Sequence, residues 1–302
     1  MKVIYCQNNK KTNKFIDIIH KTEYIILETR EKTTKYGERG IKIKLHTFGT
    51  CAGTEPMPKR HHQSFAIELE NGVYWFDAGE TSSYTAHLMG IDLLKVRSIF
   101  ISHTHMDHVG GLGNLLWNIR KISNVKKRLP LSSEIPVYIP NISTFEGIMQ
   151  VLKNTEGDFK CDFSFLPKKV TDGEIYKSPF DDFSVTAHHN NHMKKIEGEP
   201  WRSFSYEINA KGKRIIFSGD TTIEDISGLL RGKTDYFLME TGHHDSGVIA
   251  NMLTKEKKEV KNLFFTHNGR NILRDSKAAL IEAKELFSGN VVICEDGETY
   301  EL

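Results

Sequence analysis

The amino-acid sequence predicts an α/β protein in which β-sheets are flanked by helices. Short apolar runs rich in β-branched residues recur along the chain, as in 96–102, and turn-forming residues bound them. In the second half of the chain these runs alternate with amphipathic stretches that have the spacing of helices. Strands first, followed by alternating strands and helices, are typical of sheets covered by helices.

Length and composition indicate a folded globular protein. The chain has 302 residues, of which 38% are hydrophobic and 26% charged, and its net charge is only +2. A chain of this size can bury a large core, and the small net charge predicts neither a nucleic-acid-binding nor a membrane-binding surface. The sequence contains no apolar run of about 18 residues, so we expect no membrane-spanning segment and no signal peptide.

The four cysteines favour a reducing compartment. Cys6, Cys51, Cys161 and Cys294 lie far apart and form no CxxC pair. Scattered cysteines of this kind are usually free thiols in the cytosol. We therefore expect a cytoplasmic protein.

The chain divides into a short appended element and one main domain. Residues 1–40 end in a charged, glycine-punctuated stretch, and we predict an N-terminal appended element of unknown role. The main domain spans 41–302 and begins with the alternating run 41–46. We expect further strands at 64–70, 73–77, 96–102, 135–139, 183–187, 203–209, 214–217, 236–240, 262–266 and 290–294. We expect helices after Gly110-Gly111 and at 143–152, 223–230 and 276–287.

The densest chemical signal is the stretch 101–111. It places His103, His105, Asp107 and His108 within six positions, directly after the predicted strand 96–102. Imidazole nitrogens and a carboxylate at this density are the ligands that a divalent metal such as zinc takes. If the backbone stays extended, the spacing of two aims His103, His105 and Asp107 to one side.

Three further strands end in residue types that bind metals. The strand 183–187 is followed by His188, His189 and His192, the strand 214–217 by Asp220, and the strand 262–266 by His267. Two ions held close together need about three protein ligands each and a bridging carboxylate. Together with the cluster at 103–108, these strand ends predict a centre for two metal ions.

The order of these motifs resembles the metallo-β-lactamase superfamily. The resemblance covers 41–294, and the segments Gly49-Thr50, 76–80, 101–103 and 218–221 most resemble ribonuclease Z and its phosphodiesterase relatives. It implies a four-layer αββα sandwich with a dinuclear metal site at one edge. It also implies that His103, His105 and His192 bind one ion, that Asp107, His108 and His267 bind the other, and that Asp220 bridges the two. Zinc is the favoured metal, with manganese or iron as alternatives, and the resemblance further suggests a homodimer.

The choice among the three histidines after residue 187 is open. His192 is preferred because it lies five residues past Ala187, the interval that the family pattern suggests. His188 and His189 either end an exposed strand or contact the substrate. Arg202 and Arg270 are further candidates for substrate contacts.

Two adjacent histidines are candidates for the chemistry itself. In ribonuclease Z-like enzymes a histidine some two dozen residues before the last ligand stabilises the phosphate or protonates the leaving group. His243 and His244 both fit, His244 being slightly favoured by Ala250 behind it, while a helix-capping role is the structural alternative. Glu240 would orient whichever histidine acts, and Asp107 is counted as catalytic as well as a ligand. Asp77 either caps a turn or accepts a hydrogen bond that steadies the histidine loop.

These features predict a metal-dependent phosphodiesterase that attacks through a metal-bridging hydroxide. His192 and Asp220 are only 28 positions apart, where ribonuclease Z carries a long arm that grips transfer RNA. The missing arm favours a small or cyclic phosphodiester or a short nucleic acid over transfer-RNA 3′-processing. A metal-dependent ester or lactone hydrolase is the alternative enzyme, and a catalytically lapsed metal-binding module is the alternative outside enzymes.

Overall fold

A computed structural model describes residues 42–302, which form two seven-stranded β-sheets. The predicted appended element at 1–40 lies outside the described residues. Across the first sheet the order is β14 (Glu298–Glu301), β1 (Lys44–Gly49), β2 (Ser64–Glu68), β3 (Val73–Phe76), β4 (Val96–Phe100), β5 (Glu134–Ile139) and β6 (Ser164–Lys169). The pairs from β14 to β3 are antiparallel and those from β3 to β6 are parallel.

The second sheet mirrors this arrangement. Its order is β13 (Asn290–Ile293), β12 (Val260–Asn268), β11 (Thr234–Thr241), β10 (Lys213–Phe217), β9 (Phe204–Ala210), β8 (Phe183–His189) and β7 (Gly173–Lys177). The strands from β10 to β13 are parallel, whereas those from β7 to β10 are antiparallel. In each sheet a parallel block therefore adjoins an antiparallel one.

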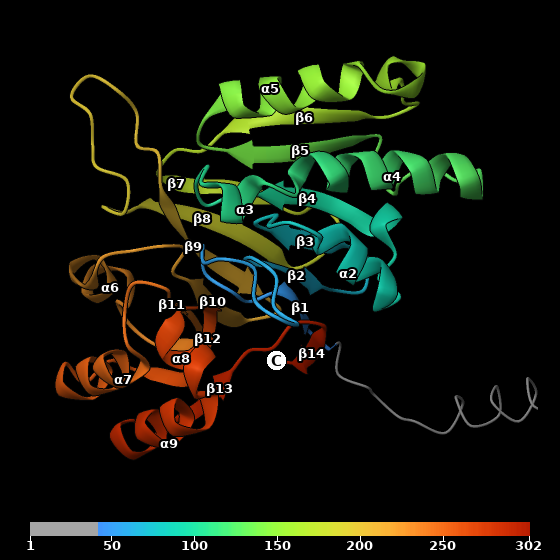
Figure 1. Cartoon of the computed structure of the whole chain (residues 1–302). Coiled ribbons are helices and arrows are strands. Elements are labelled where there is room, and N and C mark those ends of the chain that lie inside the picture. The colour runs from blue at the N-terminus through green and yellow to red at the C-terminus, as the bar shows by residue number, and fades with distance from the viewer. Residues whose placement is uncertain (1–41) are drawn as a thin grey trace, which may run out of the picture. The chain divides into compact units, whose positions relative to one another are not determined.

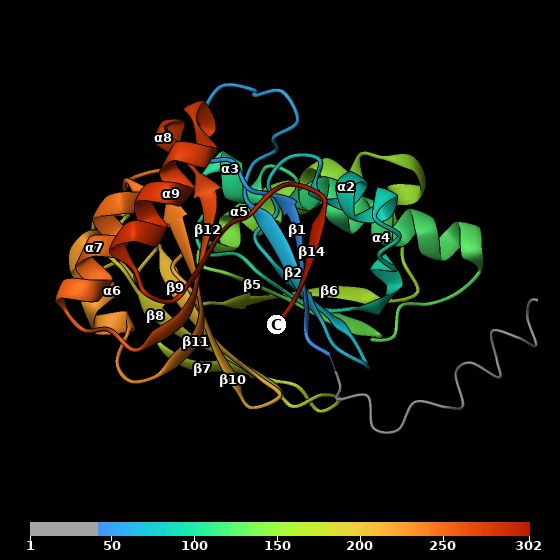
Figure 2. The same ribbon diagram turned by 90° about the horizontal axis from the view of Figure 1, so that it is seen from below.

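Helices cover the outer face of each sheet (Figures 1 and 2). The chain forms α2 (Ser82–Leu88), α3 (Met106–Val109), α4 (Leu112–Lys126), α5 (Ile142–Lys153), α6 (Ile223–Leu229), α7 (Ser246–Lys255), α8 (Arg270–Arg274) and α9 (Ser276–Leu286), with short 3₁₀ turns η1 (Leu93–Lys95) and η2 (Glu156–Phe159). Helices α2, α4 and α5 pack on the first sheet, and α6, α7 and α9 pack on the second. A third core lies between the sheets. The predicted four-layer αββα sandwich is confirmed. No helix within 42–302 is long and apolar enough to cross a lipid bilayer.

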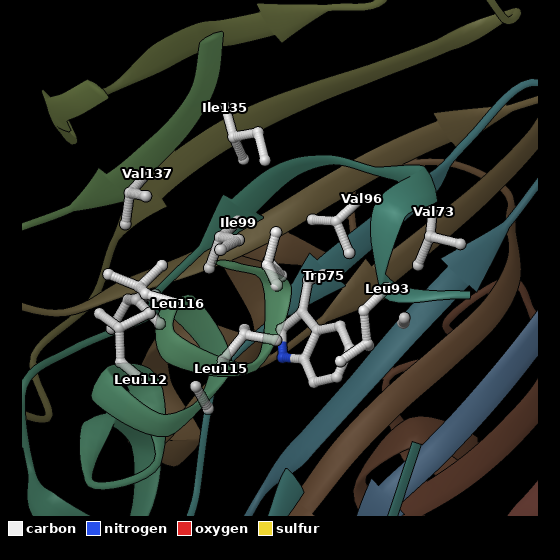
Figure 3. Packing of buried hydrophobic residues seen from close by; sticks show 14 of the residues in the cluster. Val73, Trp75, Leu93, Val96, Ile99, Leu112, Leu115, Leu116, Ile135 and Val137 are labelled. Atoms are coloured by element: carbon white, nitrogen blue, oxygen red, sulfur yellow. The ribbon is translucent and has the colours of Figure 1, made fainter. Parts of the chain in front are cut away.

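The core beneath α4 shows how the sequence pattern produces this layering. Leu112, Leu115, Leu116 and Ile119 recur at helical spacing, and all four are buried against the first sheet. Figure 3 shows the three leucines packed against Trp75 and the aliphatic side chains of β4 and β5. Burying one leucine side chain contributes about 1.5–3 kcal/mol. This packing fixes the ends of β4 and α4, between which the metal-ligand cluster lies.

Three strands were not predicted from the sequence: β6, β7 and β14. Each lies at the edge of its sheet, and each is mostly half-buried or exposed. Their sequences, SFLPKK, GEIYK and ETYE, are rich in charged residues, and the first two also contain a proline or a glycine. Edge strands tolerate such residues because one side of the strand forms no ladder hydrogen bonds, so the apolar pattern that marks a central strand is absent.

Candidate metal centre

The ends of four strands bring the sequence-predicted metal ligands together. The loop after β4 and the short helix α3 carry His103, His105, Asp107 and His108. His192 follows β8, Asp220 follows β10, and His267 lies near the end of β12. Ligand residues from all four places line one cavity of about 450 Å³. The edge of the sandwich at which these strands end is thus the candidate site.

The first ligand group consists of His103, His105, His192 and Asp220. One ligand atom from each lies within 4.8 Å of all the others. His105 Nδ1 is 3.0 Å from His103 Nε2 and 3.3 Å from His192 Nε2. Asp220 turns Oδ2 toward this group, at 3.7 Å from His103 Nε2 and 3.6 Å from His192 Nε2.

The second ligand group consists of Asp107, His108, His267 and the same Asp220. His267 Nε2 lies 3.1 Å from His108 Nε2 and 3.2 Å from Asp107 Oδ2. Asp220 turns its other oxygen, Oδ1, toward this group, at 3.2 Å from His108 Nε2. One carboxylate therefore offers a different oxygen to each group, which is the arrangement of a bridging ligand.

The geometry within the groups fits divalent ions. Ligand atoms bound at 2.0–2.1 Å to a tetrahedral ion are about 3.3 Å apart, close to the 3.0–3.3 Å between facing ring nitrogens here. Among the residues that the structure describes, the buried Oδ1 of Asp220 and Nδ1 of His267 have no hydrogen-bond partner. Imidazole and carboxylate ligands suit zinc, manganese and iron alike.

The charges in the site also favour cations. Burial opposes ionisation of Asp220, yet the neighbouring rings of His267 and His108 hold the pKa of this carboxyl well below its ordinary value. Burial likewise lowers the pKa of His267, but Asp220 and Asp107 outweigh it and raise that pKa to about 9, so that without a metal the ring holds a proton, which a bound metal ion would displace. In the first group, burial lowers the pKa values of His103 and His192, so that their rings are neutral as metal ligands must be.

Buried side chains hold the second group in place. Asp77 Oδ1 accepts the backbone N–H of Ser102 at 2.7 Å, and Asp77 Oδ2 lies 2.7 Å from His108 Nδ1. Because this contact places the proton on Nδ1, it leaves Nε2 of His108 as the ligand atom. Gln63 Oε1 accepts the backbone N–H of His267 at 3.0 Å. His267 itself has a φ of 47° where the register of β11 and β12 shifts, a β-bulge that re-aims its side chain.

Polar side chains on a loop hold His192 in the first group. Asn190 Oδ1 accepts the backbone N–H of His192 at 3.3 Å, while Asn190 Nδ2 donates to Ser205 Oγ. Asp225 in α6 accepts both the backbone N–H and the side-chain amide of Asn191, at 2.8 and 2.6 Å. Neither Asn190 nor Asp225 was identified from the sequence, although the Asn190-Asn191 pair directly before His192 was a signal for Asn190.

His243, rather than His244, has its ring against the ligands. The ring centroid of His243 is 4.9 Å from that of His192 and 6.0 Å from that of His267. Its Nδ1 is 3.1 Å from Glu240 Oε1, and this hydrogen bond raises the pKa of His243. His244 instead directs Nε2 to the carbonyl of Thr221 at 2.9 Å. Both histidines line the cavity, so the slight preference for His244 stays a prediction, while the ring contacts favour His243.

Two glycines let the backbone approach the ligands closely. A Cβ on Gly53 would lie 2.6 Å from Asp107 Oδ2, and one on Gly242 would lie 2.7 Å from His267 Nδ1. Gly53 belongs to the small-residue loop after β1, and its lack of a side chain leaves room for Asp107. Gly242 was not identified from the sequence.

Other sequence-predicted residues lie elsewhere. His188 and His189 extend β8, pair with Ser205 and Phe204, and line a separate cavity. Arg202 donates to the carbonyl of Lys194, and it is not among the residues lining the metal-ligand cavity. Arg270 does line that cavity.

The extended conformation expected for the ligand cluster is wrong at Asp107. This residue lies in the first turn of α3, which begins at Met106. The helical turn, and not a spacing of two along an extended chain, brings Asp107 and His108 to the second ligand group.

Comparisons with known proteins identify relatives of this chain. The model of the family described as "Anti-Pycsar protein Apyc1" matches residues 43–276. The chain is 41% identical to the ribonuclease Z of Treponema pallidum strain Nichols over 153 residues, which are 49% of this chain and 44% of the relative. The chain spans about half the length of the curated relatives it matches.

Solved structures share the fold. The metallo-β-lactamase fold protein YhfI from Bacillus subtilis superposes with a TM-score of 0.63 at 18% identity, covering 86% of this chain and 100% of that one. The short form of human tRNase Z superposes with a TM-score of 0.61 at 18% identity, covering 85% and 98%. The resemblance to the metallo-β-lactamase superfamily and to ribonuclease Z, predicted from the motifs, is confirmed.

Proposed function

Because the family match covers residues 43–276, more than half of the chain, the protein belongs to the family of the anti-Pycsar protein Apyc1, and on this premise we propose that it is a hydrolase dependent on two divalent metal ions. We propose that its substrates are small or cyclic phosphodiesters, or short nucleic acids. The observation that carries this proposal is Asp220, which presents Oδ2 to one group of histidines and Oδ1 to the other. Such a pair of sites clamps the attacking and leaving oxygens of a phosphoryl centre.

The bound ions would supply the chemistry that no side chain provides: they lower the pKa of water to about 7 and take up the negative charge of the transition state. The chain contributes position and a proton. Glu240 holds Nδ1 of His243 and favours the protonated ring, so that Nε2 is the nitrogen available to a leaving oxygen. His244, whose ring is bonded to the Thr221 carbonyl, would support the loop.

The size of the site favours a small substrate. His192 and Asp220 are separated by a short loop, strands β9 and β10 and one turn, with no inserted arm between them. The cavity of about 450 Å³ lies within the range of small-molecule pockets. Transfer-RNA 3′-processing stays the second candidate because the curated relatives are named ribonuclease Z. A metal-dependent ester or lactone hydrolase is the third candidate, and a lapsed metal-binding module is the one outside enzymes.

Three finer features belong to the same proposal. Zinc is the favoured ion, with manganese or iron as alternatives, because five of the seven ligand residues are histidines. A cytoplasmic location suits Cys51, Cys161 and Cys294, which are free thiols. A homodimer is tested by the mass of the protein in solution, with a value near 34.5 kDa, the mass of one chain, counting against it.

A substrate panel tests the proposal. Metal-reconstituted protein is offered 3′,5′- and 2′,3′-cyclic nucleotides, bis(p-nitrophenyl) phosphate, p-nitrophenyl acetate, an acyl lactone and a precursor transfer RNA. We expect a phosphodiester to be hydrolysed at least about tenfold faster than the esters, a difference of about 1.4 kcal/mol in activation free energy. Faster cleavage of the precursor would support the second candidate, and faster ester or lactone turnover the third. Two bound ions without hydrolysis of any substrate would support the lapsed module.

A further inference from the structure

The loop that joins β1 to β2 projects beside α8 and borders the metal-ligand cavity (Figure 2). The loop runs from Cys51 to His61, and residues 55–59 at its tip are exposed except for the half-buried Met57. Gly53 and Thr54 line the cavity together with the ligands. The tip of this loop, here called the 55–59 tip, is therefore placed where a substrate enters.

The base of the loop is fixed, whereas its tip is not built into the core. Cys51 N–H donates to the carbonyl of His61 at 2.8 Å and closes the base. The half-buried Asp296 accepts from Thr50 Oγ1 at 2.6 Å and from the backbone N–H of His61 at 2.5 Å. A tip held only by surface contacts can move while these anchors stay in place.

One such contact is a bidentate ion pair between Glu55 and Arg270. Arg270 Nη1 and Nη2 lie 2.9 and 2.6 Å from the two carboxylate oxygens of Glu55. Both side chains are exposed, Glu55 to 56% and Arg270 to 72%. The hydrogen bond from Arg270 lowers the pKa of Glu55, so Glu55 is an anion at neutral pH.

Arg270 also borders the place where a phosphodiester would bind. It follows the ligand His267 by three residues and begins α8, which holds it at the rim of the cavity. Among the described residues that line this cavity, Arg270 is the one with a permanent positive charge. A planar guanidinium binds a carboxylate and a phosphate with the same bidentate geometry.

We propose that Arg270 is a substrate-binding residue and that Glu55 is its built-in competitor, which an incoming phosphodiester displaces from the guanidinium. This inference rests on the proposed function, because it assigns Arg270 to the anionic part of the same substrate. The exchange is feasible because ion pairs between exposed side chains are weak and are screened by salt. When the phosphate takes the guanidinium, the 55–59 tip is released from α8, and the substrate enters without breaking the base of the loop.

Steady-state kinetics on the metal-loaded full chain test this exchange with bis(p-nitrophenyl) phosphate as substrate. Glu55→Gln is expected to lower KM about threefold, with a smaller change in kcat, because it weakens the competitor. Arg270→Gln is expected to raise KM about tenfold. Arg270→Lys keeps the charge but not the bidentate geometry, so we expect a smaller rise in KM. In the Arg270→Gln background, Glu55→Gln should have no further effect.

A matched control separates this effect from a general change in surface charge. Glu301→Gln removes the same charge from the exposed pair between Lys42 and Glu301, which lies at β14. It should leave both kcat and KM unchanged. If Glu55→Gln raises KM as Arg270→Gln does, or leaves KM at the wild-type value, the ion pair between Glu55 and Arg270 only stabilises the loop, and the inference is wrong.

Phosphate binding distinguishes failure of this inference from failure of the proposed function. Calorimetry with inorganic phosphate measures the dissociation constant in the same variants without any turnover. If the wild type hydrolyses no phosphodiester, the proposed function fails. Tighter phosphate binding by Glu55→Gln and weaker binding by Arg270→Gln would still support the exchange, and equal binding by all variants would overturn it.

Discussion

The two ligand groups share Asp220 but differ in how the fold supports them. In the second group, His108 and His267 have side chains that are 0% and 2% exposed, and Asp77 and Gln63 hold them from within the core. In the first group, His105 is exposed and His192 follows β8 on a loop held by Asn190 and Asp225. The second group is thus part of the packed interior, whereas the first depends on a polar loop. We infer that an ion at the second group is held more firmly and is the later one to leave on chelation.

Replacing the shared ligand, Asp220, should remove the difference in metal affinity between the two groups. Asp220→Asn takes the bridging charge from both, and the loss of several kcal/mol of electrostatic stabilisation should lower phosphodiesterase activity at least about 1,000-fold. Metal analysis of the purified variant should find less than one ion per chain. A variant that keeps two ions and near-normal activity would show that Asp220 is not the bridge.

His243 lies between the groups and should affect catalysis without affecting either ion. His243→Gln removes the proton donor, and we expect kcat to fall about 100-fold while two ions remain bound. His244→Gln, the matched variant next to it, should lower kcat much less because its ring bonds to a backbone carbonyl. The opposite order of effects would return the role to His244.

Changing Asp77 should weaken metal binding at the second group more than at the first. Asp77→Asn disturbs the contact that fixes the tautomer of His108, and losses of this kind lower metal affinity about 10- to 100-fold. Competition with a chelator measures the two affinities, and we expect the tighter one to fall more than the weaker one. The melting temperature of the metal-free variant is the control for folding. Equal loss from both sites would contradict the separation of the groups.

Changing Asp225 should lower the metal affinity of the first group, and by less than Asp77→Asn lowers that of the second. Asp225→Asn disturbs the two hydrogen bonds to Asn191 on the loop before His192, and we expect about a threefold loss of affinity at the weaker site. Glu224→Gln, next to Asp225 in α6, serves as the matched control and should change neither affinity. An effect of Asp225→Asn on the tighter site would count against the comparison.

The same contrast explains what could be predicted from the sequence. His103, Asp220 and His267 follow buried apolar strands, whose pattern predicts where each strand ends and therefore where its ligand lies. His192 follows a strand whose end is less sharply marked, and only the resemblance to the family selected it from three histidines. Contacts between side chains on separate elements, such as Asp225 with Asn191, leave no periodic signal in the sequence.

The local path of the chain at the site was the hardest feature to predict. The extended conformation expected at Asp107 failed because α3 is a single turn, too short for a helical period to show. The choice between His243 and His244 could not be made from the sequence either, because the two are adjacent and both line the cavity. Apolar periodicity predicts layers and strand ends, but it does not predict the path of a few polar residues whose conformation depends on tertiary contacts.

Anomalous diffraction from crystals of the zinc- or manganese-loaded protein tests the central claim most directly. We predict two metal peaks for each chain, one among His103, His105 and His192 and the other among Asp107, His108 and His267, with Asp220 in contact with both. A single peak, or two peaks that do not share Asp220, would contradict the account.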